Sequence, residues 1–175
     1  MTLMPNKRKY TNATFTKRVD HEAGRHRQAR AIKEPAVCKL CGAIYAKRRW
    51  AAANSDSAVK QKHWRPWQMT VCPACKQESA DEPRGFVFLD GAFFTTHQDE
   101  IEQLLRNEGE RAGEDNVLAR ILEWRRGEGH KLSVSTTTEH LAQRLGHALQ
   151  KAFDGEVEYD FSHENKLARV NWHRE

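Results

Sequence analysis

The chain has 175 residues, of which 38% are apolar and 30% are charged, and its mean hydropathy is −0.85. This composition supports a small hydrophobic core but not the interior of a large enzyme. No apolar run approaches 18 residues, and the basic cluster at residues 7–9 has no apolar stretch behind it, so we expect neither a transmembrane helix nor a secretory signal. We therefore predict a cytoplasmic protein with reduced cysteines and no membrane contact.

Positive charge is concentrated in the first part of the chain. Residues 1–75 contain 16 Lys and Arg against 4 Asp and Glu, a net charge of +12, whereas residues 76–175 contain 13 against 20, a net charge of −7. This asymmetry indicates a basic segment that binds a polyanion, joined to an ordinary acidic domain. A tail that only improves solubility is the alternative, but aromatic residues within the basic part favour polyanion binding.

Residues 1–36 form the first predicted unit, a basic arm. Nine Lys and Arg oppose three Asp and Glu here, and the sparse apolar residues follow no helical or strand period. Because the arm has almost no apolar surface to offset the entropy of ordering its backbone, we expect it to be disordered alone and ordered along RNA. The side chains of the arm that we predict to contact RNA are Lys7, Arg8, Lys9, Tyr10, Lys17, Arg18, Arg25, Arg27 and Arg30.

Residues 37–80 contain all four cysteines, arranged as two C-x-x-C pairs. A two-residue gap lets a tight turn present both sulfurs to one ion, Gly42 permits the left-handed backbone of such a turn, and Pro73 presets the turn of the second pair. Four thiolates around a tetrahedral ion make a closed structural site, so we predict one Zn²⁺ in a small zinc ribbon. The ion would contribute about 10 kcal/mol of folding free energy. The predicted ligands are Cys38, Cys41, Cys72 and Cys75.

A redox dithiol and a pair of disulfides are the alternatives for these cysteines. A redox site requires one C-x-x-C pair rather than two, and disulfides are rare in the cytosol. His63, which lies between the pairs, is a further alternative as a replacement for one cysteine. The spacer is longer than in most zinc ribbons, so we expect a loop or short helix around residues 51–62.

Between the two pairs, cationic residues alternate with tryptophans. Lys and Arg contact phosphates and indole rings stack on unpaired bases, and folded RNA offers both. We expect Trp67 in the ribbon core, Trp64 in either role, and Trp50 as the strongest stacking candidate. No helix-turn-helix or two-cysteine, two-histidine finger pattern occurs, so sequence-specific reading of duplex DNA is not indicated. The predicted RNA contacts of this segment are Lys47, Arg48, Arg49, Trp50, Lys60, Lys62, Trp64 and Arg65.

We interpret residues 81–84 as the linker between two domains, and residues 85–175 as an α+β domain. The predicted order is β-α-β-β-α-β-β, close to a ferredoxin-like split βαβ fold with one added strand. A helix at residues 117–126 is the alternative to the first strand of the central hairpin. The predicted elements are a strand at 85–90, a helix capped by Thr95 or Thr96, a loop at 107–116, a hairpin of 120–126 and 131–137, a helix capped by Thr136, and strands around 157–161 and 168–172.

We find no sequence pattern of an enzyme in the chain. A phosphate-binding loop, a G-x-S-x-G turn and an H-E-x-x-H helix are all absent from the sequence, and its nine histidines are scattered. Strand pairing and helix capping account for the hydroxyl-rich segment at residues 133–138. We therefore predict a protein without catalytic residues and without a small-molecule substrate.

Four segments near the end of the chain occur in an order that resembles the sequence of a known protein family. They lie at residues 134–138, 141–146, 148–155 and 169–174. The segments resemble the nonsense-mediated-decay-type adaptor of large-ribosomal-subunit export and its archaeal relatives, which also carry C-x-x-C knuckles ahead of this region. A shorter bacterial group, with one zinc ribbon followed by the same domain, is similar over residues 37–175.

The resemblance implies binding to the large ribosomal subunit, in assembly, transport or protection. The export adaptors have more C-x-x-C pairs and a long C-terminal extension, so nuclear export is not implied here. Together with the charge pattern, the resemblance predicts a ribosome- and rRNA-binding protein that acts in dormancy or in large-subunit assembly, with ribosomal proteins as further partners of the acidic domain. A protein-interaction or transcription-associated zinc ribbon with weak nucleic-acid binding is the alternative.

Overall fold

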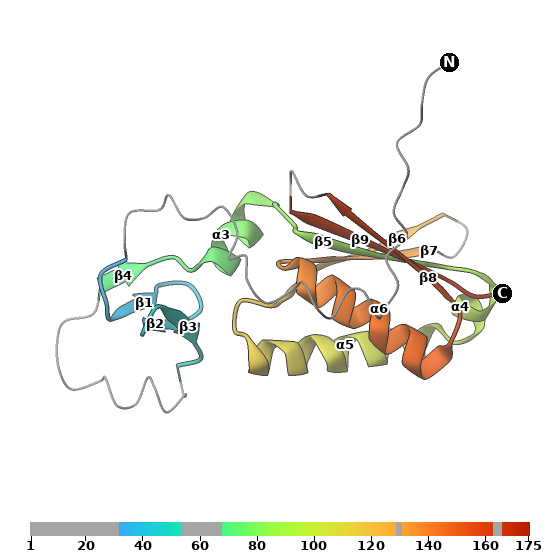
Figure 1. Cartoon of the computed structure of the whole chain (residues 1–175), viewed down its shortest axis with the longest axis horizontal. Helices are drawn as coiled ribbons and strands as arrows, with labels where there is room; N and C mark the ends of the chain where they lie inside the picture. Colours follow the sequence, from blue (N-terminus) through green and yellow to red (C-terminus); the bar gives the residue numbers. More distant parts are fainter. Residues whose placement is uncertain (1–31, 54–67, 129–130, 163–165) are drawn as a thin grey trace, which may run out of the picture.

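The computed structural model describes residues 32–53, 68–128, 131–162 and 166–175, which form two sheets and their helices (Figure 1). The predicted basic arm therefore lies almost entirely outside the described residues. The chain is mixed α+β, with a small four-stranded sheet followed by a larger five-stranded sheet. None of the described helices is long and apolar enough to cross a membrane.

The four-stranded sheet consists of strands of only three residues each. Its order is β3-β2-β1-β4, with β1 parallel to β4 and the other neighbours antiparallel. Small side chains fill its interior, including Ala36 and Ala46, so its apolar core is slight. The helix α3 follows this sheet. Its elements are β1 (Ala36–Cys38), β2 (Ile44–Ala46), β3 (Arg49–Ala51), β4 (Gln68–Thr70) and α3 (Pro73–Ala80).

The five-stranded sheet has the order β6-β7-β5-β9-β8. Strand β5 lies at its centre, antiparallel to β7 and parallel to β9. The hairpin predicted for residues 120–126 and 131–137 is confirmed as the antiparallel pair β6 and β7, and the alternative helix at 117–126 is wrong. The strands are β5 (Gly85–Asp90), β6 (Ile121–Gly127), β7 (Lys131–Thr136), β8 (Glu156–Ser162) and β9 (Leu167–His173).

Helices α5 and α6 lie on one face of this sheet (Figure 1). Helix α6 packs against β5 and β9, and α5 packs alongside α6. The buried residues between helices and sheet form one core, in which Trp172 and Phe94 are the largest fully buried side chains. The helices of this domain are α4 (Ala92–Thr96), α5 (Gln98–Asp115) and α6 (Glu139–Phe153).

The structure corrects three local predictions in the helices. Residues 107–115 belong to α5 rather than to a loop, because Glu and Arg favour helix and form pairs along it, such as Arg111 with Glu108 at 2.7 Å. Thr95 and Thr96 lie inside α4 and cap nothing. The cap of α6 is Thr138, two residues after the predicted Thr136, and its Oγ1 accepts a hydrogen bond from the Leu141 N–H at 3.2 Å.

Helix α6 approaches the sheet most closely at Gly146. A Cβ atom added there would lie 2.6 Å from Cγ1 of Val170 in β9. We expect Gly146→Ala to destabilise the protein by about 1–3 kcal/mol through overpacking, although alanine is the better helix former. Urea unfolding followed by circular dichroism measures this, with Gly113→Ala in α5, where the nearest atom would be 3.6 Å away, as the matched control. Equal stability of the two variants would contradict the packing argument.

Candidate metal centre

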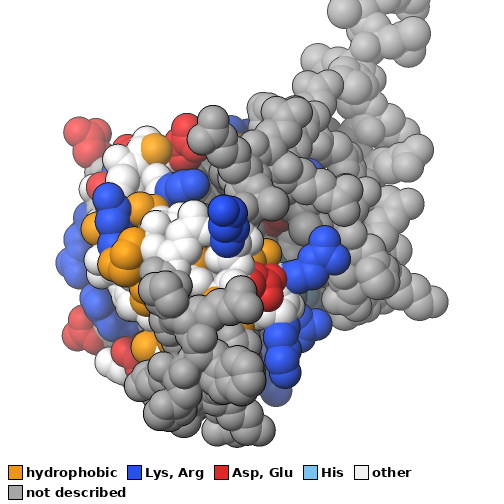
Figure 2. Space-filling view, turned by 90° about the vertical axis from the view of Figure 1, so that its left-hand side faces the viewer, with side chains coloured by type: hydrophobic (Ala, Val, Ile, Leu, Met, Phe, Trp, Pro, Cys, Tyr) orange, Lys and Arg blue, Asp and Glu red, His pale blue; other side chains and the backbone are white. Residues whose placement is uncertain are grey.

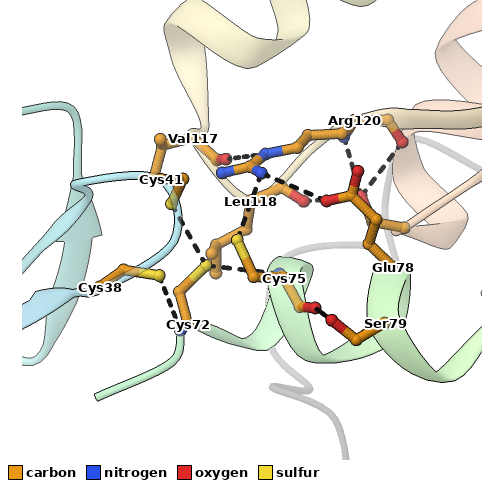
Figure 3. Close-up of polar contacts among 10 residues, drawn as sticks. Cys38, Cys41, Cys72, Cys75, Glu78, Ser79, Val117, Leu118 and Arg120 are labelled. Atoms are coloured by element: carbon orange, nitrogen blue, oxygen red, sulfur yellow. Dashed lines mark hydrogen bonds and ion pairs between the residues drawn. The ribbon is translucent and has the colours of Figure 1, made fainter.

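Four cysteine thiols meet at one point between the four-stranded sheet and α3 (Figure 3). Their sulfur atoms all lie within 4.8 Å of one another, and Cys41 Sγ is 3.7 Å from Cys72 Sγ. Bonds of about 2.3 Å from a tetrahedral ion to sulfur would place the sulfurs about 3.8 Å apart, so the set fits one metal ion. All four are free thiols, and Cys41 alone is exposed. No other such cluster lies within the described ranges.

The first pair is held by a turn at the end of β1. The Cys38 N–H donates to the Ala43 carbonyl at 2.8 Å, and the Gly42 N–H donates to the Cys38 carbonyl at 2.9 Å. Gly42 has the left-handed conformation that the sequence predicted, with φ of 76°. The turn aims the backbone N–H groups of Leu40 and Cys41 at the Cys38 sulfur.

The second pair opens helix α3 instead of forming a second free turn. Cys72 is the N-cap, and its sulfur accepts a hydrogen bond from the Cys75 N–H at 3.5 Å. Pro73 stands in the first helical position, where its φ fits and its missing N–H costs nothing. Pro73 thus presets the turn between these two cysteines, and this turn is the first turn of a helix. The positive end of the helix dipole favours the thiolate form of these two cysteines.

The surroundings of the sulfurs differ in their effect on thiol pKa. Burial raises the pKa of Cys38, but backbone N–H groups, led by that of Cys72 at 3.3 Å, outweigh burial and lower this pKa to about 6. Burial raises the pKa of both Cys72 and Cys75. A bound cation would offset this cost by replacing the protons with positive charge, so the chemistry of the cluster suits metal ligation.

A guanidinium from the α+β domain reaches the sulfur cluster (Figure 3). Arg120, just before β6, donates from Nη1 to Cys75 Sγ at 3.5 Å, and the same nitrogen lies 3.8 Å from the Glu78 carboxylate in α3. Burial lowers the pKa of Arg120, but contacts with Cys41 and Cys75 outweigh burial and raise it, so this cation stays charged beside the thiols. No local sequence pattern points to Arg120, because 45 residues separate it from Cys75.

Apolar contacts join the same two parts of the molecule. Val117 and Leu118, in the loop that follows α5, pack against the buried cysteines together with Trp50. Trp50 is half-buried, and its ring centroid lies 5.2 Å from that of Tyr45. The structure thus places the residue predicted to stack on RNA partly in the packing of the cysteine cluster.

The basic turn between β2 and β3 lies at the surface of the cysteine module, by which we mean residues 32–53 and 68–80. Lys47, Arg48 and Arg49 are exposed. Lys47 and Arg48 have left-handed backbones, and their N–H groups each donate to the Glu34 carboxylate at 2.8 Å. Three predicted RNA contacts are therefore presented together by a fixed turn.

The other predicted RNA contacts lie outside the described residues, as does His63, the alternative metal ligand. These contacts are Lys7, Arg8, Lys9, Tyr10, Lys17, Arg18, Arg25, Arg27, Arg30, Lys60, Lys62, Trp64 and Arg65.

Comparison with protein-family models, curated proteins and solved structures gives no match to this chain. The resemblance to the ribosomal export adaptors therefore stays a prediction.

Removing the metal should unfold the cysteine module and spare the larger domain. Its alanine-rich sheet has little other support, whereas residues 85–175 have a separate core. We expect a strong chelator to abolish amide protection at residues 36–51 and 68–80 and to leave β5 and β9 protected, as measured by hydrogen-exchange mass spectrometry. The variant Cys72→Ser should reproduce this pattern without chelator. Unchanged protection of the module after complete metal removal would contradict a structural metal.

Arg120 should strengthen metal binding although it is not a ligand. We expect Arg120→Met, which keeps the aliphatic stem, to weaken metal affinity about tenfold, because outer-shell partners of metal ligands typically have effects of this size. Competition with a chromophoric chelator measures the affinity. Arg111→Met, which removes an exposed arginine from an ion pair on α5, is the control and should bind metal like the wild type. Equal metal affinity of the two variants would show that Arg120 does not contribute to metal binding.

Proposed function

We propose that this chain is a non-enzymatic, cytoplasmic RNA-binding protein that associates with the ribosome through its basic cysteine module. The observation that carries the proposal is the exposed basic turn of Lys47, Arg48 and Arg49, at the end of β1 and β2 opposite to the four-thiol cluster. Hydrogen bonds to Glu34 hold this turn in place before binding, so less conformational entropy is lost when its cations meet phosphates.

We infer that the metal is Zn²⁺ and that its role is structural. Four thiolates are soft ligands that suit zinc or iron–sulfur chemistry, and a single tetrahedral site with no open position favours zinc. We also interpret residues 37–80 as a zinc ribbon. We likewise interpret the larger domain as a variant of the ferredoxin-like arrangement, in which β9 runs parallel to β5 and lies between β5 and the edge strand β8.

Electrostatics favour nucleic acid at the module end of the molecule. The described residues of the cysteine module contain six Lys and Arg against two Asp and Glu, which leaves a positive charge even beside a zinc tetrathiolate of charge −2. Figure 2 views the molecule from this end, and Lys and Arg side chains stand on several sides of it. A basic arm of residues 1–36 would extend the same surface.

Ribosomal RNA supplies the dense phosphate and unpaired bases that such a surface can bind. We propose the large subunit as the favoured partner, with a role in dormancy or in assembly. The α+β domain, acidic by sequence, would then dock elsewhere on the particle, on RNA or on a ribosomal protein, or stay exposed. No membrane, small-molecule substrate or catalytic step enters the proposal.

A protein-interaction or transcription-associated module is the second candidate. Exposed apolar side chains on the cysteine module favour it, because Leu40 is 59% exposed and Met69 is 63% exposed. These two residues would contact a protein partner, while the basic arm attracts nucleic acid only weakly. Retention of a defined partner after nuclease treatment would favour this candidate over ribosome binding.

Neutralising the basic turn should weaken binding to ribosomes. We expect Lys47→Gln, Arg48→Gln and Arg49→Gln together to reduce co-sedimentation with ribosomes in sucrose gradients. They should also reduce the salt slope of RNA binding by about 2, because each lost phosphate contact reduces it by about 0.7–0.9. Deletion of residues 1–36 should act in the same direction.

The matched control removes three exposed cations from the α+β domain and should sediment like the wild type. Absence of the wild-type protein from every ribosomal fraction at low salt would reject the proposed function. An unchanged salt slope in the triple variant would show that the basic turn does not contact RNA phosphates. The control substitutions are Arg111→Gln, Lys131→Gln and Lys151→Gln.

A further inference from the structure

The face of the five-stranded sheet opposite α5 and α6 has an aromatic centre. Side chains alternate along β5, so Val87 and Leu89 point into the core and are at most 1% exposed, whereas Phe86 and Phe88 point the other way. Phe88 is 38% exposed. We call this the open face of the sheet.

The two phenylalanine rings lie parallel on the open face. The centroids of Phe86 and Phe88 are 6.0 Å apart, and their planes differ by 15°. The rings stand on the central strand of the sheet and border a hollow of about 360 Å³, within the range of small-ligand sites. Single exposed apolar residues are common, but here two aligned rings on one strand border the same hollow.

Polar and cationic side chains flank both rings. On one side, Phe88 pairs in register with Ser133, which pairs with Arg125. On the other side, Phe86 pairs with Arg169 and Phe88 with Asn171, both exposed. The apolar surface is therefore narrow and bounded by hydrogen-bonding groups, which suits planar polar ligands better than the broad apolar face of a protein partner.

Acidic side chains outnumber basic ones on the open face. Arg125 lies 2.7 Å from the Glu123 carboxylate, and Arg169 pairs in register with Asp160 of β8. Further carboxylates are those of Asp81, which borders the hollow, and Glu158, which pairs in register with Asn171. The arginines can still reach a phosphate beside the rings, but the local field does not attract one. A ligand here would be held by ring contacts more than by charge.

We propose that the open face binds single-stranded RNA, with two successive unpaired bases stacked on Phe86 and Phe88. Aromatic side chains on the solvent face of a sheet stack bases in a common class of RNA-binding domain. Ser133 and Asn171 would contact base edges or 2′-hydroxyls, and Arg125 and Arg169 would contact phosphates. The inference rests on the proposed function and deepens it, because it assigns an unpaired RNA segment to the larger domain while the cysteine module contacts the backbone.

The open face and the basic turn should differ in the form of RNA that they bind and in the variants that weaken this binding. The test uses the full-length, metal-loaded protein, a fluorescein-labelled 12-nucleotide oligouridylate and a blunt 12-base-pair RNA duplex, with binding followed by fluorescence anisotropy. We expect Phe88→Leu to weaken oligouridylate binding about five- to a hundredfold, the range for loss of one stacked base, and to leave duplex binding unchanged. Phe88→Tyr keeps the ring and should bind within about threefold of the wild type.

Folding is controlled by comparing the thermal transitions of the two Phe88 variants. The triple variant at Lys47, Arg48 and Arg49 should show the opposite pattern, with weaker duplex binding and a smaller loss on oligouridylate. Phe88→Leu binding as tightly as Phe88→Tyr would overturn the stacking proposal, because apolarity rather than a ring would then suffice.

The outcomes also separate this inference from the proposed function. Wild-type protein that binds the duplex but not oligouridylate would overturn the open-face site and leave ribosome binding intact. Wild-type protein that binds neither RNA would reject both.

Discussion

Four thiols lie within 4.8 Å of one another in a module that its apolar side chains support only weakly. Its strands have three residues each, and its buried side chains are largely alanines, so the area that they remove from water is small. The cysteines come from the end of a strand, from a turn and from the first turn of a helix. An ion bound to all of them would therefore set the relative positions of β1, β4 and α3 at once.

The same cluster connects the module to the larger domain. Arg120 donates to Cys75, and Leu118 packs against the buried sulfurs, although both precede β6. The loop that carries them begins where α5 ends at Asp115. The helical continuation through the polar residues 107–115 brings this loop to the cysteine cluster. The boundary at residues 81–84 separates two sheets along the chain, but side chains bridge it in space.

Local sequence patterns predicted the strands of the larger domain, its hairpin and the grouping of the cysteines, because each depends on neighbouring residues. The alternation of residues 121–127 and 131–136 can be recognised in the sequence, and so can the C-x-x-C spacing. The helical state of residues 107–115 could not be recognised there, because these residues are as polar as a loop. Only the structure shows their i,i+3 and i,i+4 pairs and the packing of Ala112. Arg120 beside Cys75 and the parallel pairing of β1 with β4 are long-range contacts that no local pattern encodes.

The position of β9 has a consequence for how this protein is made. The strand that comes last in the chain lies inside the sheet, between β8 and the central β5, and pairs Gly85 with Ala168. During vectorial synthesis, β5, β6 and β7 emerge first and can pair, but one side of β5 stays open until residue 173 has left the exit tunnel. The core can therefore close only after β9 has been made, through a pairing of high contact order between residues 85–90 and 168–173.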